Sequence, residues 1–337
     1  MKPFGWALIG PGKIAHRFAG AVQTMEGAQL IAVHGRDPLR AAVFAQQWSR
    51  PGKPVESAQP IEAILTDERI DGVYIATPHA FHAGAIRQCL AAGKPVLCEK
   101  PLVPNLSQGL EMVSLARQQR VFLMEAVWTR FLPVYAEVQD WLRSGAIGCI
   151  RGIQSSFCID IPFNSTSRTH DPAQAGGALL DIGVYNLTMT RWVLQAALGN
   201  CPPLQSLNAC GVIGPSGVDH RVSATFEFTD GVTSQFICAV DAHADNGLRI
   251  IGENGQITIP RRFWEATVAE LHVEGQQTIS INRPFRINGF EGEIEVAMAA
   301  IGRGDIESPL MSHEDTLATL KWMDRIRAII GVRYPFE

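Results

Sequence analysis

The feature that most constrains the fold of this 337-residue chain is a regular alternation of apolar runs and helical patterns over residues 1–124. Five short runs rich in Val, Ile and Leu have the composition of buried strands, and they are FGWALIG, QLIAVHG, DGVYIAT, KPVLCE and RVFLME. Helical patterns lie between these runs, near residues 13–25, 38–48, 79–92 and 105–119. Strands that are apolar on both sides and separated by helices predict an α/β fold with a doubly wound parallel sheet.

After residue 124 the pattern changes, which predicts a second domain over residues 125–337. Helices are expected over residues 133–144, 177–195 and 312–330. The runs SLNACGVIG, HRVSATFEFTD, GVTSQFICAVD, LRIIGENG and QITIP have strand character, and the Asp-Gly at 230–231 and the GENG at 252–255 each predict a hairpin. We therefore expect an α+β domain with a largely antiparallel, open sheet. A capping box at Ser312 opens the last helix, and we allow for this helix packing back on the first domain.

Composition excludes several classes of protein. The net charge is −4 and the basic residues are scattered singly, which argues against a nucleic-acid partner. No run of about eighteen apolar residues occurs, so no membrane segment is expected. Seven irregularly spaced cysteines without a C-x-x-C, and an N-terminus without a signal peptide, favour a reducing cytoplasm. The nine histidines show no metal-binding spacing, so no metal is expected.

A glycine-rich segment, GPGKIA, follows the first expected strand and opens the first helix. Gly10 permits a tight turn, Gly12 lets the backbone approach a pyrophosphate, and Ala15 takes the position that packs the helix. The start of this helix, with Lys13 and Ile14, offers backbone N–H groups and a partial positive charge to phosphates. An ordinary strand–helix turn is the alternative, but the position at the start of the alternating pattern favours a dinucleotide site.

The end of the second expected strand bears on the choice of cofactor. A site selective for NAD would place an acidic side chain there to bind the ribose hydroxyl, but this chain has Gly35, which leaves room. Arg36 follows and is suited to a 2′-phosphate, so we expect NADP, with NAD as the alternative. Asp37 argues for NAD, but we interpret it as the N-cap of the helix that Pro38 begins.

Three residues supply groups that can move a proton on and off an alcohol oxygen. Lys100 follows a buried strand, at the carboxyl edge of the sheet where ligands of open α/β folds bind. Asp181 and Tyr185 are four residues apart on an expected helix, which places them on one face. Gly176 and Gly177 just before would let the backbone approach a ligand. A surface lysine and a helix N-cap are the alternative interpretations of Lys100 and Asp181.

Further cofactor contacts are expected from the loops beside these strands. Thr77, Pro78, His79 and His82 follow the DGVYIAT strand, where a loop would cover the ribose and nicotinamide. Either histidine alone is more often a residue that begins a helix than a ligand. Glu99 is expected to be a cofactor contact or a structural partner rather than a catalytic group.

Several segments together resemble the Gfo/Idh/MocA family of NAD(P)-dependent oxidoreductases. They are GPGKIA, DGVYIATPHAFH, AGKPVLCEKPL, EAVWTRFLP and GGALLDIGVYNL. The last two, with tyrosine at 185, are similar to the branch that contains dimeric dihydrodiol dehydrogenase, NADP-dependent D-xylose dehydrogenase and glucose–fructose oxidoreductase. The resemblance implies a Rossmann domain over residues 1–124 and a substrate-binding domain whose open sheet forms a homodimer or a higher oligomer. It also implies that Trp128 and Arg130 line the nicotinamide pocket, and it leaves Arg168 and His170 as candidate substrate contacts.

The sequence thus predicts an NADP-preferring dehydrogenase or reductase that acts on a secondary alcohol or carbonyl of a sugar, polyol or cyclic diol. In the oxidative direction, Tyr185 accepts the hydroxyl proton, Lys100 stabilises the developing oxyanion and Asp181 positions both. The alternative is a non-catalytic regulatory protein of the same fold that responds to a dinucleotide or a sugar. The complete Lys-Asp-Tyr set argues against that alternative, because a sensor needs no proton donor.

Overall fold

The computed structural model describes residues 2–337, which form two compact units. The first unit contains the residues up to Trp128 together with Arg286–Leu317, and the second contains Thr129–Phe285 and Ala318–Glu337. The second unit thus begins after Trp128, and a late stretch of the chain returns to the first unit.

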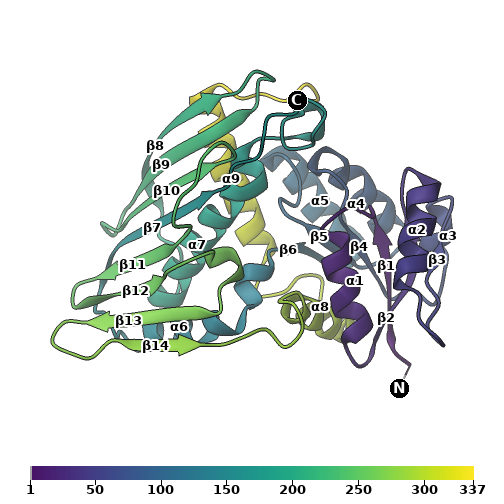
Figure 1. The fold of residues 1–337 in the computed structure, drawn as a ribbon, viewed down its shortest axis with the longest axis horizontal. Coiled ribbons are helices and arrows are strands. Elements are labelled where there is room, and N and C mark those ends of the chain that lie inside the picture. The colour runs from purple at the N-terminus through teal and green to yellow at the C-terminus, as the bar shows by residue number, and fades with distance from the viewer. Residues whose placement is uncertain (1) are drawn as a thin grey trace. The chain divides into compact units, whose positions relative to one another are not determined.

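The first unit is built on a six-stranded parallel sheet (Figure 1). The strands are β1 (Phe4–Ile9), β2 (Ala28–His34), β3 (Glu56–Ser57), β4 (Gly72–Ile75), β5 (Val96–Glu99) and β6 (Leu123–Ala126). The helices are α1 (Ala15–Thr24), α2 (Pro38–Trp48), α3 (Glu62–Leu65), α4 (His82–Ala91), α5 (Leu106–Gln119) and α8 (Glu291–Arg303). The order β3-β2-β1-β4-β5-β6 reverses direction between β1 and β4, which is where such sheets bind their ligands. The predicted doubly wound α/β fold is confirmed.

The returning segment packs on α1. The Arg17 guanidinium donates two hydrogen bonds to the carbonyl oxygen of Asn288, at 3.0 and 2.7 Å, and the Asn288 amide donates back to the carbonyl of Arg17 at 2.8 Å. The carboxylate of Glu291, which opens α8, accepts the backbone N–H groups of four residues before it. α8 was not among the expected helices, because the Arg17 side chain that holds the start of this segment lies more than 270 positions away in the chain.

The second unit is built on an eight-stranded sheet in the order β14-β13-β12-β11-β7-β10-β9-β8. Its strands are β7 (Ile150–Cys158), β8 (Leu204–Ile213), β9 (Asp219–Phe228), β10 (Thr233–Ala239), β11 (Leu248–Gly252), β12 (Gly255–Ile259), β13 (Val268–Val273) and β14 (Ile279–Asn282). Neighbours pair antiparallel except β7 and β10, which are parallel. Both predicted hairpins form, β9–β10 at Asp230 and Gly231 and β11–β12 at the GENG segment. The largely antiparallel sheet is therefore confirmed, and β7, β13 and β14 are additions to the expected strands.

One face of this sheet is covered and the other is open. In Figure 1, α6 (Pro133–Arg143) and α7 (Val184–Leu198) lie on one side of the sheet. Trp322 of α9 (His313–Ile330) packs on β9, with its ring centroid 5.1 Å from that of Phe226. The N-terminus of α9 is capped as predicted, because the Ser312 hydroxyl accepts the N–H of Asp315 at 3.1 Å. On the uncovered face the strands form a hollow of about 730 Å³.

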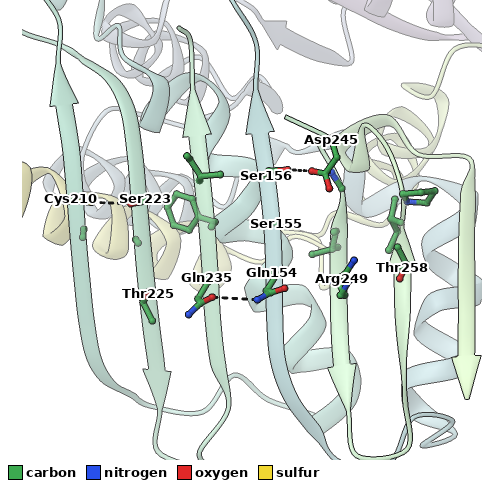
Figure 2. A pocket seen from close by; sticks show the side chains of 18 of the residues that line it. Gln154, Ser155, Ser156, Cys210, Ser223, Thr225, Gln235, Asp245, Arg249 and Thr258 are labelled. Carbon is green, nitrogen blue, oxygen red and sulfur yellow. Dashed lines mark hydrogen bonds between the residues drawn. The ribbon is translucent and has the colours of Figure 1, made fainter. Parts of the chain in front are cut away.

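The hollow is lined mainly by small and polar side chains (Figure 2). Gln154 of β7 donates to Gln235 of β10 at 3.4 Å, and Ser156 donates to Asp245 at 2.6 Å. None of the predicted catalytic residues lines it. We therefore do not assign this hollow of the second unit as the active site.

Three further observations concern membrane-spanning helices, cysteines and metal sites. Over residues 2–337, no helix combines the length and the apolar character that crossing a bilayer requires. All seven cysteines are free thiols, and four of them are buried. In the same described range, no group of three or more His, Cys, Asp or Glu residues is arranged to hold a metal ion.

Candidate active site

The turn after β1 has a backbone that only glycine fits. Gly10 has a φ of +94°, and a Cβ there would lie 2.7 Å from backbone atoms of Ala76 and Thr77. At Gly12, by contrast, a Cβ would meet no atom nearer than 4.0 Å, so the space above this backbone is open. α1 begins directly afterwards, with exposed Lys13 and Ile14 preceding it. The residues present therefore fit a phosphate group at the helix N-terminus.

The end of β2 carries no acidic ligand for a ribose, and the room expected beside Gly35 is filled by the Pro11 ring. A Cβ at Gly35 would lie 2.8 Å from the Pro11 ring, so no side chain fits at this position. Arg36 is exposed. Asp37 caps α2 as predicted, because its carboxylate accepts the backbone N–H groups of Leu39 at 2.9 Å and Arg40 at 3.3 Å.

His82 joins the loops that follow β4 and β5. Its ring is fully buried, with Nε2 2.8 Å from the carbonyl oxygen of Thr77 and Nδ1 2.9 Å from that of Pro101. Burial lowers the pKa of His82, and the hydrogen bonds to the two carbonyl oxygens act in the opposite direction. These contacts give His82 a role in holding the two loops together, whereas we expected it to contact the cofactor. His79, also buried, lies beside it with ring centroids 5.8 Å apart.

Glu99 and Lys100 stand at the carboxyl end of β5. The Tyr74 hydroxyl donates to Glu99 Oε1 at 2.5 Å, so Glu99 is a structural partner in this structure. Burial, and then the charge of Glu99, hold the pKa of Tyr74 well above its usual value. Lys100 is half-buried, and its peptide bond to Pro101 is cis. The lysine is therefore placed at the ligand-binding edge of the sheet, as its position in the sequence predicted.

Trp128 ends the first unit and is buried beneath α1. The Arg17 guanidinium lies 4.2 Å from the centroid of the Trp128 ring, and Phe290 packs on the same ring at 5.2 Å. Arg17 and Phe290 were not among the predicted site residues, because nothing in their local sequence indicates a stacking partner so far along the chain.

Asp181 and Tyr185 lie in the second unit, and both are buried. The expected helix begins with a π-helical segment, Leu179–Gly183, before α7 continues it. Asp181 accepts hydrogen bonds from the Arg168 guanidinium at 3.1 and 3.2 Å. The structure thus pairs a predicted catalytic carboxylate with a predicted substrate contact, which the spacing of thirteen residues did not indicate.

The two glycines before this segment face protein atoms rather than open space. A Cβ at Gly176 would lie 2.6 Å from the carbonyl oxygen of Thr169, and one at Gly177 would collide with the carboxyl group of Asp219. Asp219 accepts the N–H of Leu179 at 2.6 Å, so Asp219, and not Asp181, holds the start of the segment. The expectation that these glycines let the backbone approach a ligand is therefore wrong, because protein atoms occupy the space beside them. The interpretation of Asp181 as a helix N-cap is also wrong.

The remaining predicted residues have partners of their own. The Arg130 guanidinium donates to Gln195 Oε1 at 3.1 Å. His170 is fully buried, and its ring packs 5.1 Å from the rings of both Phe163 and His220. His170 is therefore part of an aromatic cluster within the second unit.

Comparisons with known proteins cover nearly the whole chain. A family model for the oxidoreductase family with an NAD-binding Rossmann fold (GFO_IDH_MocA) matches residues 4–127, and a model for the GFO/IDH/MocA C-terminal domain matches residues 135–258. Trans-1,2-dihydrobenzene-1,2-diol dehydrogenase of Mus musculus is 32% identical, over 98% of this chain and 98% of that protein. The Danio rerio enzyme of the same name is 34% identical, over 98% and 97%.

Two solved structures are similar over the same length. A 3-ketoreductase from Actinomadura kijaniata in complex with NADP and TDP-benzene has a TM-score of 0.83 and 26% identity, covering 97% of this chain and 98% of that one. Aldose-aldose oxidoreductase from Caulobacter crescentus, complexed with glycerol, has a TM-score of 0.85 and covers 98% of each chain. Its identity of 22% supports the fold alone.

Proposed function

Because the chain is a member of the Gfo/Idh/MocA family of NAD(P)-dependent oxidoreductases that act on CH–OH groups, we propose that it transfers a hydride between NADP(H) and a cyclic diol or a sugar. The observation that carries this substrate class is the similarity, over 98% of the chain, to dehydrogenases that act on a cyclic diol. The 3-ketoreductase, 26% identical and solved with NADP, supports a carbonyl group as the hydride acceptor and NADP as the cofactor.

We propose that the dinucleotide is held by the first unit. The turn of Gly10 and Gly12 would lie against the pyrophosphate, because its backbone excludes side chains and leaves open space at the start of α1. Thr77, Pro78 and Glu99 border the same edge of the sheet. Arg36 would meet a 2′-phosphate, since Asp37 is engaged as a helix cap, and this arrangement favours NADP over NAD.

The bound nicotinamide supplies the carbon that accepts or donates the hydride. We propose that Tyr185 exchanges the proton of the substrate hydroxyl, because a phenol can serve as both acid and base. The Lys100 ammonium would stabilise the oxyanion that develops as the carbonyl is reduced. Asp181, whose carboxylate Arg168 holds with two hydrogen bonds, would orient the substrate hydroxyl. Trp128 and Arg130 would border the nicotinamide.

A direct absorbance assay for turnover tests this proposal. The purified chain is incubated with NADP⁺ and trans-dihydrodiols, aldoses or inositols, and with NADPH and the corresponding ketones, and reduced nicotinamide is followed by its ultraviolet absorbance. We expect turnover with at least one diol or sugar. Tight binding of NADP(H) without turnover of any compound would contradict the proposal and favour the regulatory binding protein instead.

We also propose that two copies of the chain associate through the open face of the eight-stranded sheet. The hollow there is lined mainly by small and polar side chains, which could form hydrogen bonds with the same face of a second copy. Sedimentation equilibrium tests this: Gln235→Arg, in the middle of the face, should give monomers, whereas Gln118→Arg, at an exposed position of α5, should not. A dimer that survives Gln235→Arg would contradict the assignment of this surface as the interface.

We also propose a cytoplasmic setting, which the seven free thiols support and which fractionation of the native host cells would test.

A further inference from the structure

The segment that follows α9 contacts the part of the second unit that carries Asp181. Tyr334 of this segment is buried, and its hydroxyl donates to the carbonyl oxygen of Gly176 at 2.6 Å. The two residues are 158 positions apart in the chain. Burial, and then the charge of Asp219, raise the pKa of Tyr334 well above its usual value, so the hydroxyl keeps the proton that this hydrogen bond requires.

A buried arginine of α9 holds Tyr334 in place. The Arg327 guanidinium donates to both carboxylate oxygens of Glu337 at 2.8 Å and to Asp324 at 2.7 Å. The same Glu337 carboxylate accepts the backbone N–H of Tyr334 at 3.2 Å. The guanidinium carbon of Arg327 also lies 5.0 Å from the centroid of the Tyr334 ring. The position of the phenol is therefore fixed from α9 as well as by its hydrogen bond to Gly176.

The turn of Gly176 and Gly177 links the backbones of two residues that form an ion pair. The N–H of Gly177 donates to the carbonyl oxygen of Thr169, which directly follows Arg168, at 2.8 Å. The carbonyl oxygen of Gly177 accepts the N–H of Asp181 at 3.2 Å. The Arg168 guanidinium donates to the two carboxylate oxygens of Asp181 at 3.1 and 3.2 Å. The geometry of this ion pair therefore depends on the turn.

We propose that Tyr334 is a positioning residue for the hydride-transfer reaction. Its hydroxyl holds the turn at Gly176, and the turn holds the Arg168 guanidinium at hydrogen-bonding distance from Asp181. Asp181 then orients the substrate hydroxyl, so Tyr334 acts through this carboxylate and not on the substrate. The role of Asp181 rests on the proposed function, whereas the link from Tyr334 to the turn rests on hydrogen bonds of the second unit.

Hydrogen exchange tests the link between Tyr334 and the turn without any substrate. Tyr334→Phe removes only the hydroxyl group and deprives the Gly176 carbonyl of this donor. The amides of Gly177 and Asp181 should then exchange about tenfold faster or more, because the loss of a buried hydrogen bond lowers the free energy of local opening.

Tyr135→Phe is the matched control. The buried Tyr135 hydroxyl donates to the carbonyl oxygen of Phe263, also at 2.6 Å and within the second unit. Both variants therefore lose a similar hydrogen bond, and a general loss of stability affects both. Only Tyr334→Phe should accelerate the amides of Gly177 and Asp181 beyond those of the rest of the unit.

A double-mutant cycle tests whether Tyr334 acts through Asp181, with a substrate found in the absorbance assay. Tyr334→Phe should lower kcat/KM by about tenfold or more, because a misplaced orienting group slows the reaction, and should leave the dissociation constant of NADP⁺ unchanged. In an Asp181→Asn background, which lacks the carboxylate that Arg168 holds, the same substitution should change kcat/KM by less than about twofold. A tyrosine that only stabilised the fold would lower kcat/KM by the same factor in both backgrounds.

Equal factors in the two backgrounds would overturn the proposal, as would exchange at Gly177 and Asp181 that Tyr334→Phe leaves unchanged. Glu337→Gln is a milder variant, because it weakens the contact with Arg327 and keeps the phenol. It should accelerate the same amides by a smaller factor, and an unchanged rate would contradict the role of this segment. If the wild type turns over no diol, sugar or ketone, the proposed function fails, and the exchange measurement still decides whether Tyr334 holds the turn.

Discussion

Replacing Asp219 by asparagine should stabilise the protein at neutral and alkaline pH. Asp219 is fully buried at the start of β9, and one carboxyl oxygen accepts the N–H of Leu179 at 2.6 Å while the other has no partner among residues 2–337. Burial raises the pKa of Asp219 from 3.8 to about 7, although the backbone hydrogen bond acts in the opposite direction. Asparagine keeps an acceptor for Leu179 and carries no charge to bury.

The sign and the size follow from the two pKa values. Between about pH 4 and pH 7 the folded protein retains a proton on Asp219 that the unfolded chain has lost, so stability falls as pH rises through this range and stays lower above it. Raising a pKa from 3.8 to about 7 corresponds to about 4 kcal/mol, because each pKa unit represents about 1.4 kcal/mol. Asp219→Asn should therefore match the wild type near pH 4 and exceed it by up to about 4 kcal/mol near pH 8.

Urea unfolding at a series of pH values measures this difference, with Asp230→Asn in the exposed hairpin turn as the control. Hydrogen exchange of the Leu179 amide reports the local effect, since this residue lies two positions before Asp181. A variant that is less stable than the wild type near pH 8, or a difference that does not vary with pH, would refute the burial of an ionisable Asp219.

Other outcomes follow from the site. Tyr185→Phe and Lys100→Met should each lower turnover by about 100-fold or more, with cofactor affinity retained, because acid–base assistance contributes about 10²–10⁴-fold; turnover near the wild-type rate in either variant removes that residue from the mechanism. Arg36→Ala should weaken binding of NADP⁺ by about tenfold or more and leave NAD⁺ unaffected, as a charge-assisted contact to the 2′-phosphate requires; parallel losses for both cofactors would exclude that contact. Gly10→Ala should abolish dinucleotide binding and destabilise the first unit by about 1–3 kcal/mol, because a Cβ there meets the Ala76 carbonyl group. Calorimetry measures the binding and thermal unfolding measures the stability, and unchanged binding would contradict the role of this turn in holding the pyrophosphate.

Local signals in the sequence were sufficient for most of the first unit. α2 spans Pro38–Trp48 as expected, because Asp37 and Pro38 form a cap that is complete within four residues. The buried strands could also be predicted, since near-continuous apolar runs that alternate with helices are typical of strands of a parallel sheet covered on both faces. The place of Lys100 at the edge of the sheet follows directly from those strands.

Features that depend on distant partners could not be predicted in this way. The parallel pairing of β7 with β10 joins segments about eighty residues apart, and hairpin signals give no information on it. The packing of Phe290 on Trp128 and the hydrogen bonds of Arg17 to Asn288 depend on a segment that returns to the first unit only after residue 285. Gly176 and Gly177 were expected to let the backbone approach a ligand, but the sequence could not show that Thr169 and Asp219 occupy the space.

The central claim is direct hydride transfer between NADP(H) and a carbinol carbon, and deuterium transfer from NADPH labelled at C4 tests it most directly. The labelled cofactor is incubated with the protein and a carbonyl substrate identified in the assay, in ordinary water, and the product is examined by mass spectrometry. The account predicts one deuterium atom at the new carbinol carbon and none in the solvent. Product that carries only solvent hydrogen at that carbon would contradict it.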